Sequence, residues 1–339
     1  MEHYGIKGNI HRLVSSWLTQ HRRVCVDVEE SSNKPVRSGV PHKTVMGPLL
    51  CFLIYINDMD KSIPRTSTLR LVADDSLLYR PVNTTYDDKR LQEDLTELTK
   101  WAEKWQMTFH PAKCYILRVN RKKNPIITNY EMLGQQLETV HQYPYLGEEL
   151  SEDLAWEPHI NKVISKANRT LGFLRRNIYK CPQDIKAQTY ISLVRSHLEY
   201  ALSVWDPLRK CHINALEMVQ RKAARFVTSN YTREPRTVTT ILQNLGWQTL
   251  ENRRQMARLT LLYKFINQEA AVNIPPYLTK PTTRTRQYHY QRFSRLSIST
   301  DTYKYSFIPR TISDWNNLPP EVIISPSVDS FREGLQKQM

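Results

Sequence analysis

Hydrophobic and polar positions alternate in helical steps over two long stretches of the chain. Leucines and tryptophans recur every three or four residues from Leu91 to Trp105 with Glu and Lys between them, which predicts an amphipathic helix. A second apolar stripe runs from Ile160 to Ile178 with the same spacing. The basic residues off this stripe are Lys162, Lys166, Arg169, Arg175 and Arg176. We expect the second helix to pack on one side and to contact phosphates on another.

Two short apolar runs flank an acidic pair between Leu69 and Tyr79. Apolar runs on either side of two turn-favouring residues predict a β-hairpin with Asp74 and Asp75 at or beside its tip. At a tight bend both carboxylates can reach one small volume, whereas neighbours in a regular strand point to opposite faces. Two like charges there repel unless a cation neutralises them, and Mg²⁺ is the usual hard partner of oxygen ligands. The alternative interpretation is a solvated Asp-Asp turn.

The length and composition indicate a globular protein with two or three domains. The chain has 339 residues, of which 40% are hydrophobic and 10% aromatic. Its five cysteines are widely spaced and form no C-x-x-C pair, which fits a reduced compartment and argues against structural zinc. No signal-peptide pattern begins the chain, and the longest apolar run, from Leu49 to Ile56, is too short to span a bilayer. We expect a soluble intracellular protein, in the nucleus or the cytoplasm, with no membrane partner.

The positive charge is concentrated in the second half of the chain. Residues 1–150 carry 20 Lys and Arg against 18 Asp and Glu, whereas residues 151–339 carry 28 against 15. This distribution favours a polyanion-binding half attached to a near-neutral half. The alternatives are a solvated helical surface and a membrane-facing patch. Trp, Tyr and Phe lie among the basic residues, and because aromatic rings stack on bases they favour nucleic acid.

A loop rich in Gly and Pro gives the sequence its most specific signal. Its blocks are Ser38-Gly39-Val40-Pro41, Gly47-Pro48-Leu49-Leu50 and Tyr55-Ile56-Asn57-Asp58. They resemble the reverse transcriptase of non-LTR (LINE-type, jockey-like) retrotransposons, whose pattern is close to S-G-V-P-Q-G-T-x-L-G-P-L-L-F-x-x-Y-I-N-D. The F-A-D-D catalytic hairpin of that family corresponds to Val72-Ala73-Asp74-Asp75, in the same order and at a compatible spacing.

Three later blocks extend the resemblance. The segment from Met107 to Cys114 resembles a block whose lysine, here Lys113, lies near the phosphates of the incoming nucleotide and could neutralise or protonate the leaving group. The turn formed by Tyr145, Leu146 and Gly147 resembles the Y-L-G turn that grips the primer end. Residues 166–176 resemble the thumb helix. The alternatives for the first two blocks are a plain surface lysine and a simple hairpin.

The resemblance implies an RNA-directed DNA polymerase of α+β fold. We expect partial fingers and a palm of antiparallel strands backed by helices over residues 1–150, a helical thumb over 151–230, and a basic C-terminal region with a partly flexible linker over 231–339. The implied partners are an RNA template, a DNA primer and deoxynucleoside triphosphates, with no specific protein partner. Gly39, Pro41 and Gly47 would contact nucleotide and template, Asp74 and Asp75 would bind Mg²⁺, and the five basic residues of the second helix would contact nucleic acid.

Several departures from the family pattern bear on activity. Polymerases use two Mg²⁺ ions roughly 3.5–4 Å apart, and the family holds them with three aspartates, one on a strand expected before Tyr4. We therefore expect this chain alone to polymerise poorly or not at all, and the alternative function is a non-catalytic remnant that binds nucleic acid through its basic half. His42-Lys43 replaces Gln-Gly in the loop, and Val72 replaces Phe, a milder change. Glu148-Glu149 is expected to place two negative charges near a primer.

Overall fold

The computed structural model divides the chain into two compact units, Met1–Val140 and His141–Met339. It describes residues 2, 5–19, 21–35, 52–64, 66–120, 126–272, 274–281 and 291–339. Both helices and strands are present, as the expected α+β class requires. The division lies ten residues before the expected boundary at 150/151, so the hairpin formed by residues 142–151 belongs to the second unit. The division into palm, thumb and C-terminal region stays a prediction.

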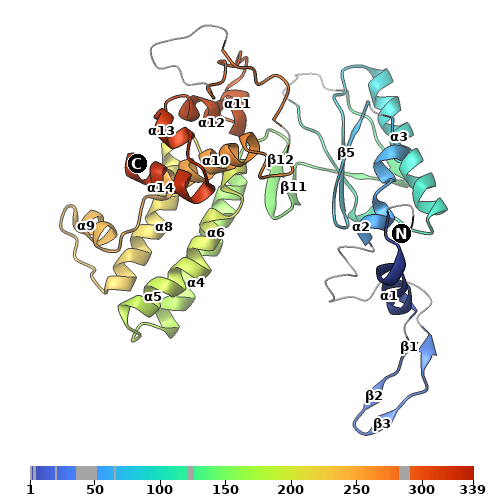
Figure 1. Ribbon diagram of the computed structural model, residues 1–339, viewed down its shortest axis with the longest axis horizontal. Helices are drawn as coiled ribbons and strands as arrows, with labels where there is room; N and C mark the ends of the chain where they lie inside the picture. Colours follow the sequence, from blue (N-terminus) through green and yellow to red (C-terminus); the bar gives the residue numbers. More distant parts are fainter. Residues whose placement is uncertain are drawn as a thin grey trace. The chain divides into compact units, whose positions relative to one another are not determined.

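The first unit combines short strands with one long helix (Figure 1). Its helices are α1 (Gly8–Leu18), α2 (Leu53–Ile56), the 3-10 helix η3 (Met59–Ser62), α3 (Thr85–Lys104) and the 3-10 helix η4 (Pro111–Lys113). Its strands are β1 (His21–Arg22), β2 (Cys25–Val26), β3 (Glu29–Glu30), β4 (Lys34–Pro35), β5 (Thr68–Val72), β6 (Asp75–Tyr79), β7 (Tyr115–Leu117), β8 (Glu131–Met132), β9 (Gln135–Gln136) and β10 (Glu138–Val140).

Helix α3 confirms the helix expected from Leu91 to Trp105, and it organises the core of the first unit. It begins with a capping box, in which the Thr84 hydroxyl and the Asp87 carboxylate each accept a hydrogen bond from the other residue's backbone N–H. Leu98 and Trp101 are buried from its inner face. Side chains from β5 and β6 pack on the same cluster, so the acidic hairpin is supported from α3.

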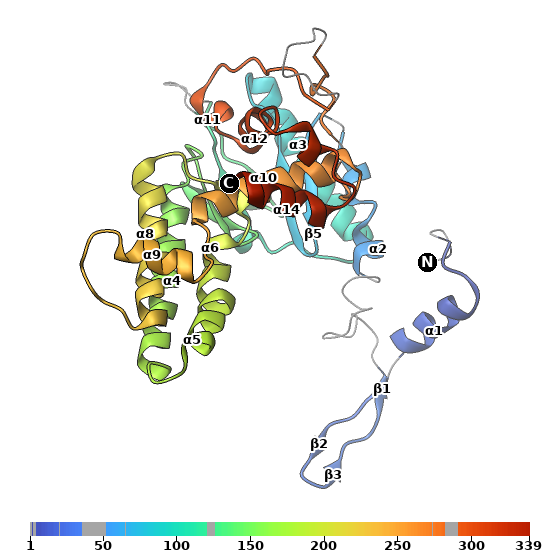
Figure 2. The ribbon, with the colours of Figure 1, turned by 60° about the vertical axis from the view of Figure 1, so that its left-hand side comes forward.

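The second unit is almost entirely helical. Its helices are α4 (Glu157–Asn177), α5 (Gln183–Tyr190), the π-helix η5 (Ile191–Arg195), α6 (Ser196–Glu199), α7 (Leu202–Trp205), α8 (Lys210–Thr228), α9 (Thr237–Asn244), α10 (Leu250–Ile266), α11 (Asp301–Lys304), α12 (Phe307–Trp315), α13 (Pro320–Ile323) and α14 (Val328–Gln338). Its strands are β11 (Gln142–Tyr145) and β12 (Glu148–Ser151). Figures 1 and 2 show α4, α6 and α8 side by side.

Two hydrophobic clusters stabilise the second unit. The first lies between α4, η5, α6 and α8, with Trp205 fully buried in it. The second gathers α10, α12, α13 and α14 around Trp315 and Phe331, both 0% exposed. The C-terminal region therefore has its own packed core. Most of the linker expected from Lys280 to Arg295 lies outside the described residues.

The strands of the described part of the chain form six two-stranded sheets. Five are antiparallel, and β7 pairs with β10 in parallel. The palm sheet implied by the resemblance stays a prediction. Among the helices in the described ranges, none combines the length and the apolar composition that crossing a bilayer requires.

Candidate active site and nucleic-acid interface

The acidic pair lies at the tip of the β5–β6 hairpin, as the sequence predicts. Val72 pairs with Asp75, so Ala73 and Asp74 form a two-residue loop and Asp75 is the first residue of β6. Ala73 has φ +50°, the left-handed value that a tight hairpin turn imposes at this position and that an alanine adopts only at a cost. Asp74 and Asp75 are both exposed. The hairpin thus presents two adjacent carboxylates to solvent.

The open end of the same hairpin is anchored to α3 by one buried carboxylate. Asp94, on α3, is 2% exposed. It accepts a hydrogen bond from the hydroxyl of Ser67, directly before β5, and lies 3.8 Å from a guanidinium nitrogen of Arg80, directly after β6. Sequence reasoning missed Asp94 because an aspartate on an amphipathic helix is ordinarily solvated. The two strand ends are therefore held together by a contact with a third element.

Lys113 ends η4 and is separated by one residue from β7, which begins at Tyr115. Its side chain is exposed. None of the ion pairs between described residues joins Lys113 to Asp74 or Asp75. Its proposed contact with nucleotide phosphates stays a prediction.

The predicted nucleotide and template contacts lie in the loop before α2. Gly39, Pro41 and Gly47 fall within residues 36–51, outside the described residues, as does the His42-Lys43 departure. The acidic hairpin and Lys113 are therefore the described members of the predicted active site.

Leu146 and Gly147 form the two-residue loop between β11 and β12, with φ +50° and +89°. Two successive positive φ values define the type I′ turn of a tight hairpin, and glycine suits the second position. The hydroxyl of Tyr200 donates a hydrogen bond of 3.0 Å to the Leu146 carbonyl oxygen. A Cβ added at Gly147 would lie 3.1 Å from the Tyr200 ring. Tyr200 thus supports the predicted primer-grip turn, and no sequence signal pointed to it.

The residues directly after this turn do not present two free negative charges, so that expectation is wrong for Glu148. Its side chain is buried, and its Oε2 lies 2.7 Å from Nε2 of His159, at an angle that gives no hydrogen bond. Glu149 pairs with Lys162 on α4. Both carboxylates thus lie against α4, Glu148 beside His159 and Glu149 beside Lys162.

Burial shifts the proton affinities of this pair in opposite directions. It raises the pKa of Glu148 to about 7, although the charge of Lys162 opposes the shift. It lowers the pKa of His159 to about 4, against the charge of Glu149. Nδ1 of His159 accepts the backbone N–H of Glu149 at 3.2 Å, so the proton of the neutral ring is on Nε2, facing Glu148. His159 therefore links α4 to β12 in its neutral form.

Helix α4 confirms the expected amphipathic pattern. Ile160, Val163, Ala167, Leu171 and Leu174 are buried. The five predicted nucleic-acid contacts, Lys162, Lys166, Arg169, Arg175 and Arg176, are all exposed. The structure thus gathers them on one helix but leaves them in a different unit from Asp74, Asp75 and Lys113.

The segment that supplies Tyr200 is fixed by a buried charge cluster that the sequence did not reveal. The side chain of Asp206 is 6% exposed, and its two carboxylate oxygens lie 2.8 Å from Nε of Arg254 and 2.8 Å from Nε of Arg258, both on α10. Arg310, on α12, lies 3.1 Å from the same carboxylate. Buried pairs of this kind are strongly destabilised when one partner is removed. The cluster therefore ties the end of α7 to the C-terminal helices.

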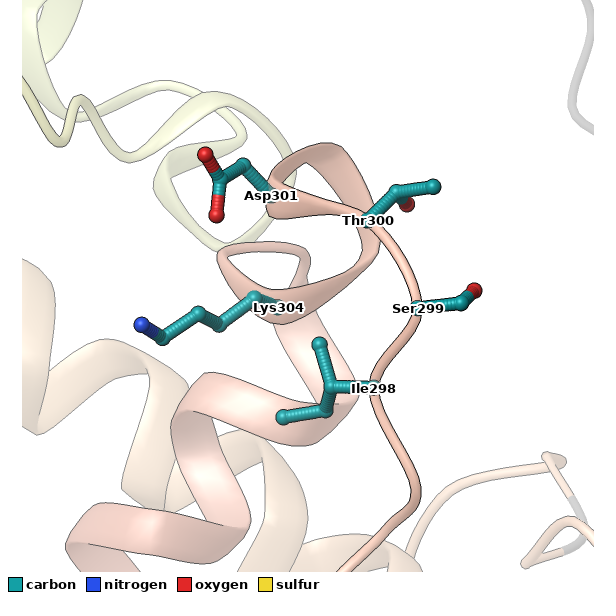
Figure 3. A pocket seen from close by; sticks show the side chains of 5 residues that line it. All are labelled: Ile298, Ser299, Thr300, Asp301 and Lys304. Atoms are coloured by element: carbon teal, nitrogen blue, oxygen red, sulfur yellow. The ribbon is translucent and has the colours of Figure 1, made fainter.

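An open pocket of about 440 Å³ lies at the start of α11 in the second unit. It is lined by Ile298, Ser299, Thr300, Asp301 and Lys304. In Figure 3 the Asp301 and Lys304 side chains point to one side of the turn and those of Ser299 and Thr300 to the other. These polar groups do not converge, and no predicted site residue lines the pocket. We therefore assign it no catalytic or binding role.

The donor set at the acidic hairpin suits a hard divalent cation. Mg²⁺ is commonly held by one or two carboxylates together with water and substrate phosphates. Asp74 and Asp75 supply exposed carboxylates of this kind. In the described part of the chain, no three His, Cys, Asp or Glu side chains group into a metal site. The residues thus fit a metal shared with a phosphate ligand.

Comparison with known proteins gives relatives of one kind. The chain is 28% identical over 262 residues to a Drosophila melanogaster protein named "Probable RNA-directed DNA polymerase from transposon BS", an alignment that covers 72% of this chain and 28% of that protein. It is 28% identical over 232 residues to the RNA-directed DNA polymerase from mobile element jockey of the same species, covering 65% of this chain and 25% of the relative. The chain is also 28% identical over 230 residues to the RNA-directed DNA polymerase from mobile element jockey of Drosophila funebris, an alignment that covers 63% of this chain and 24% of that protein.

The chain is thus similar to RNA-directed DNA polymerases of Drosophila mobile elements. This confirms the resemblance found in the Gly- and Pro-rich loop and the acidic hairpin. The chain spans about a quarter of the length of these polymerases. No family profile matches the chain, and no solved structure matches it.

Proposed function

We propose that the chain is part of an RNA-directed DNA polymerase of a non-LTR retrotransposon and that Asp74 and Asp75 are its catalytic carboxylates. The observation that carries the proposal is the tight β5–β6 hairpin, which presents two adjacent exposed acids within a homologue of these polymerases. The substrates would be an RNA template, a DNA primer and deoxynucleoside triphosphates.

Asp74 and Asp75 would hold Mg²⁺, which when bound activates the attacking 3′ hydroxyl and stabilises the triphosphate. Lys113 would place a positive charge near the nucleotide phosphates, and the turn at Leu146 and Gly147 would contact the primer end. The family uses three aspartates, and Asp74 and Asp75 would be two of them.

Primer extension tests the enzymatic proposal directly. The purified chain is given an RNA template, an annealed DNA primer, nucleotides and Mg²⁺, and the product length is measured. Asp74→Asn removes one metal-binding charge with little change in shape, so we expect it to abolish whatever extension the chain performs. Asp60→Asn, in η3 and away from the hairpin, is the matched control and should leave extension unchanged. Extension that survives Asp74→Asn would contradict the assignment.

A second candidate function is metal-independent nucleic-acid binding, and the charge of the second unit favours it. Residues 141–339 carry 28 Lys and Arg against 17 Asp and Glu, a formal charge of +11. Binding that is unchanged by EDTA, together with no detectable extension, would support this function. Extension that requires Mg²⁺ and Asp74 would support the polymerase.

A further inference from the structure

One exposed face of α4 carries a continuous stripe of basic and aromatic side chains. The stripe consists of Lys162, Lys166, Arg169, Phe173 and Arg176, which follow one another at steps of four, three, four and three residues. Residues at these steps lie on the same side of a helix. With a rise of 1.5 Å per residue the stripe is about 21 Å long.

The stripe lies away from the core of the second unit. The face of α4 that carries Val163, Ala167 and Leu171 packs against α6 and α8. Phe173 projects from the other side and is 56% exposed. A single exposed aromatic ring is ordinary on a protein surface. This one is distinctive because basic residues flank it on both sides along the helix.

Most of the charge on the stripe has no counter-ion among the residues that the structure describes. Lys162 pairs with Glu149. Among the ion pairs formed by the described residues, none involves Lys166, Arg169 or Arg176. The charge of Lys166 adds to burial in lowering the pKa of His197 on the adjoining α6. The stripe is therefore a site of uncompensated positive charge, and a polyanion would neutralise it.

Gly172, directly before Phe173, leaves room for the Arg176 side chain along the helix. A Cβ added at Gly172 would lie 3.5 Å from Nη1 of Arg176, so the guanidinium folds back along the helix over this glycine. Side chains on a helix lean toward its N-terminus, which brings the end of Arg176 to the level of Phe173. Phe173 and Arg176 are therefore neighbours, one turn apart, on the same face of α4.

We propose that Phe173 stacks on a base of a single-stranded nucleic acid whose phosphates are bound by Lys166, Arg169 and Arg176. The proposal rests on nucleic-acid binding by the second unit and deepens it by naming the strand state and the stacking residue. A single strand is indicated because its bases expose their faces, whereas a duplex buries base faces and presents only edges and phosphates. RNA and DNA share these groups, so the inference covers both.

Two adjacent arginines provide a matched pair of variants. Arg175 and Arg176 are both exposed in the last turn of α4. Arg176 lies on the stripe, whereas Arg175 is one residue away and so points about 100° around the helix, off the stripe. Arg175→Gln and Arg176→Gln change the net charge equally. Any difference between them reports the position of the bound strand.

The test measures the Kd of the full chain for a labelled single-stranded 15-mer, as RNA and as DNA, and for a duplex of the same length at several salt concentrations. We expect Phe173→Ala to weaken binding of the single strand about tenfold or more and binding of the duplex less than twofold. Phe173→Leu should lose as much affinity for the single strand as Phe173→Ala does, because leucine has no aromatic ring. Phe173→Tyr should keep wild-type affinity. Arg176→Gln should reduce the salt dependence by about one unit of slope, and by more than Arg175→Gln does.

Each alternative result has a definite meaning. If the wild-type chain binds and Phe173→Ala leaves single-strand affinity unchanged, the stacking inference is wrong while nucleic-acid binding stands. Equal losses for single strand and duplex would also overturn it, since stacking would then not distinguish them. If the wild-type chain binds neither RNA nor DNA, the proposed binding function itself fails. Circular dichroism and thermal unfolding of each variant measure whether its helix content and stability match those of the wild type.

Discussion

Glu148 and His159 are a buried acid and base whose contributions to stability respond to pH in opposite directions. The folded pKa of Glu148, about 7, exceeds its ordinary value of 4.5. Its contribution is therefore fully present below pH 4.5 and is lost as the pH rises through 7. The folded pKa of His159, about 4, is below its ordinary value of 6.5. Its contribution is present above pH 6.5 and is lost as the pH falls through 4, so the two slopes oppose each other between pH 4.5 and 6.5.

The difference in free energy of unfolding between a variant and wild type should follow the pH dependence of the side chain that was replaced. We predict that Glu148→Gln becomes more stable relative to wild type as the pH rises from 4.5 to 7. As the pH rises from 4 to 6.5, His159→Gln should become less stable relative to wild type. Each change should be on the order of 2 kcal/mol across its range. Urea unfolding at half-unit pH intervals measures both. Parallel slopes for the two variants would contradict the assignment of opposed shifts.

The side chains that decide local geometry at this scale were the hardest to predict from sequence. Asp74 and Asp75 were placed correctly because the apolar runs beside them specify a hairpin. His159, Tyr200 and Asp94 were missed because a polar residue is expected at the surface unless a partner is known. Their partners come from distant parts of the chain, and nothing in a local pattern encodes such a pairing.

Helices α3 and α4 were predicted well because each has a regular apolar face and more than five turns of sequence to show it. The irregular elements were not predicted from the sequence. The π-helix η5 continues α5 into α6, and its apolar residues are read equally well as ordinary helix. The short strands of the first unit pair in twos, so their partners depend on turns rather than on long alternating patterns.

Two helical glycines should respond differently to the same substitution. Gly172 lies inside α4, where an added Cβ would meet only Arg176, at an ordinary 3.5 Å. We predict that Gly172→Ala stabilises the chain by about 0.5–1 kcal/mol, because alanine loses less backbone entropy in a helix. Gly334 lies inside α14, where an added Cβ would lie 3.3 Å from both methyl groups of Val322.

Gly334→Ala is therefore the matched contrast to Gly172→Ala. Val322 is buried, so its methyl groups cannot move freely, and the crowding should cancel or reverse the gain in helix propensity. Thermal unfolding of both variants beside the wild type measures the difference. Equal stabilisation by the two substitutions would show that α13 and α14 are packed more loosely than this structure indicates.

At the scale of the whole molecule, the cores show which segments fold together. One hydrophobic cluster lies within residues 1–140, and the other two lie within residues 141–339. The resemblance implied a palm over residues 1–150 and a thumb from residue 151, and this division stays a prediction. The contacts of β11 and β12 with α4 and with Tyr200 lie in the second unit instead. Composition and periodicity cannot assign a hairpin to one of two neighbouring units.

Two fragments distinguish these boundaries. We predict that residues 141–339 unfold cooperatively and bind nucleic acid with the salt dependence of the full chain, since they contain both clusters and the basic stripe. A fragment of residues 152–339 lacks the hairpin, which leaves the buried Nδ1 of His159 without the backbone N–H of Glu149 and Tyr200 without the Leu146 carbonyl. It should unfold at a lower urea concentration, by about 2–4 kcal/mol in free energy, because a buried polar group loses its partner. Equal stability of the two fragments would mean that the hairpin contributes nothing to the helical unit, and the primer-grip turn would then have no support from α4.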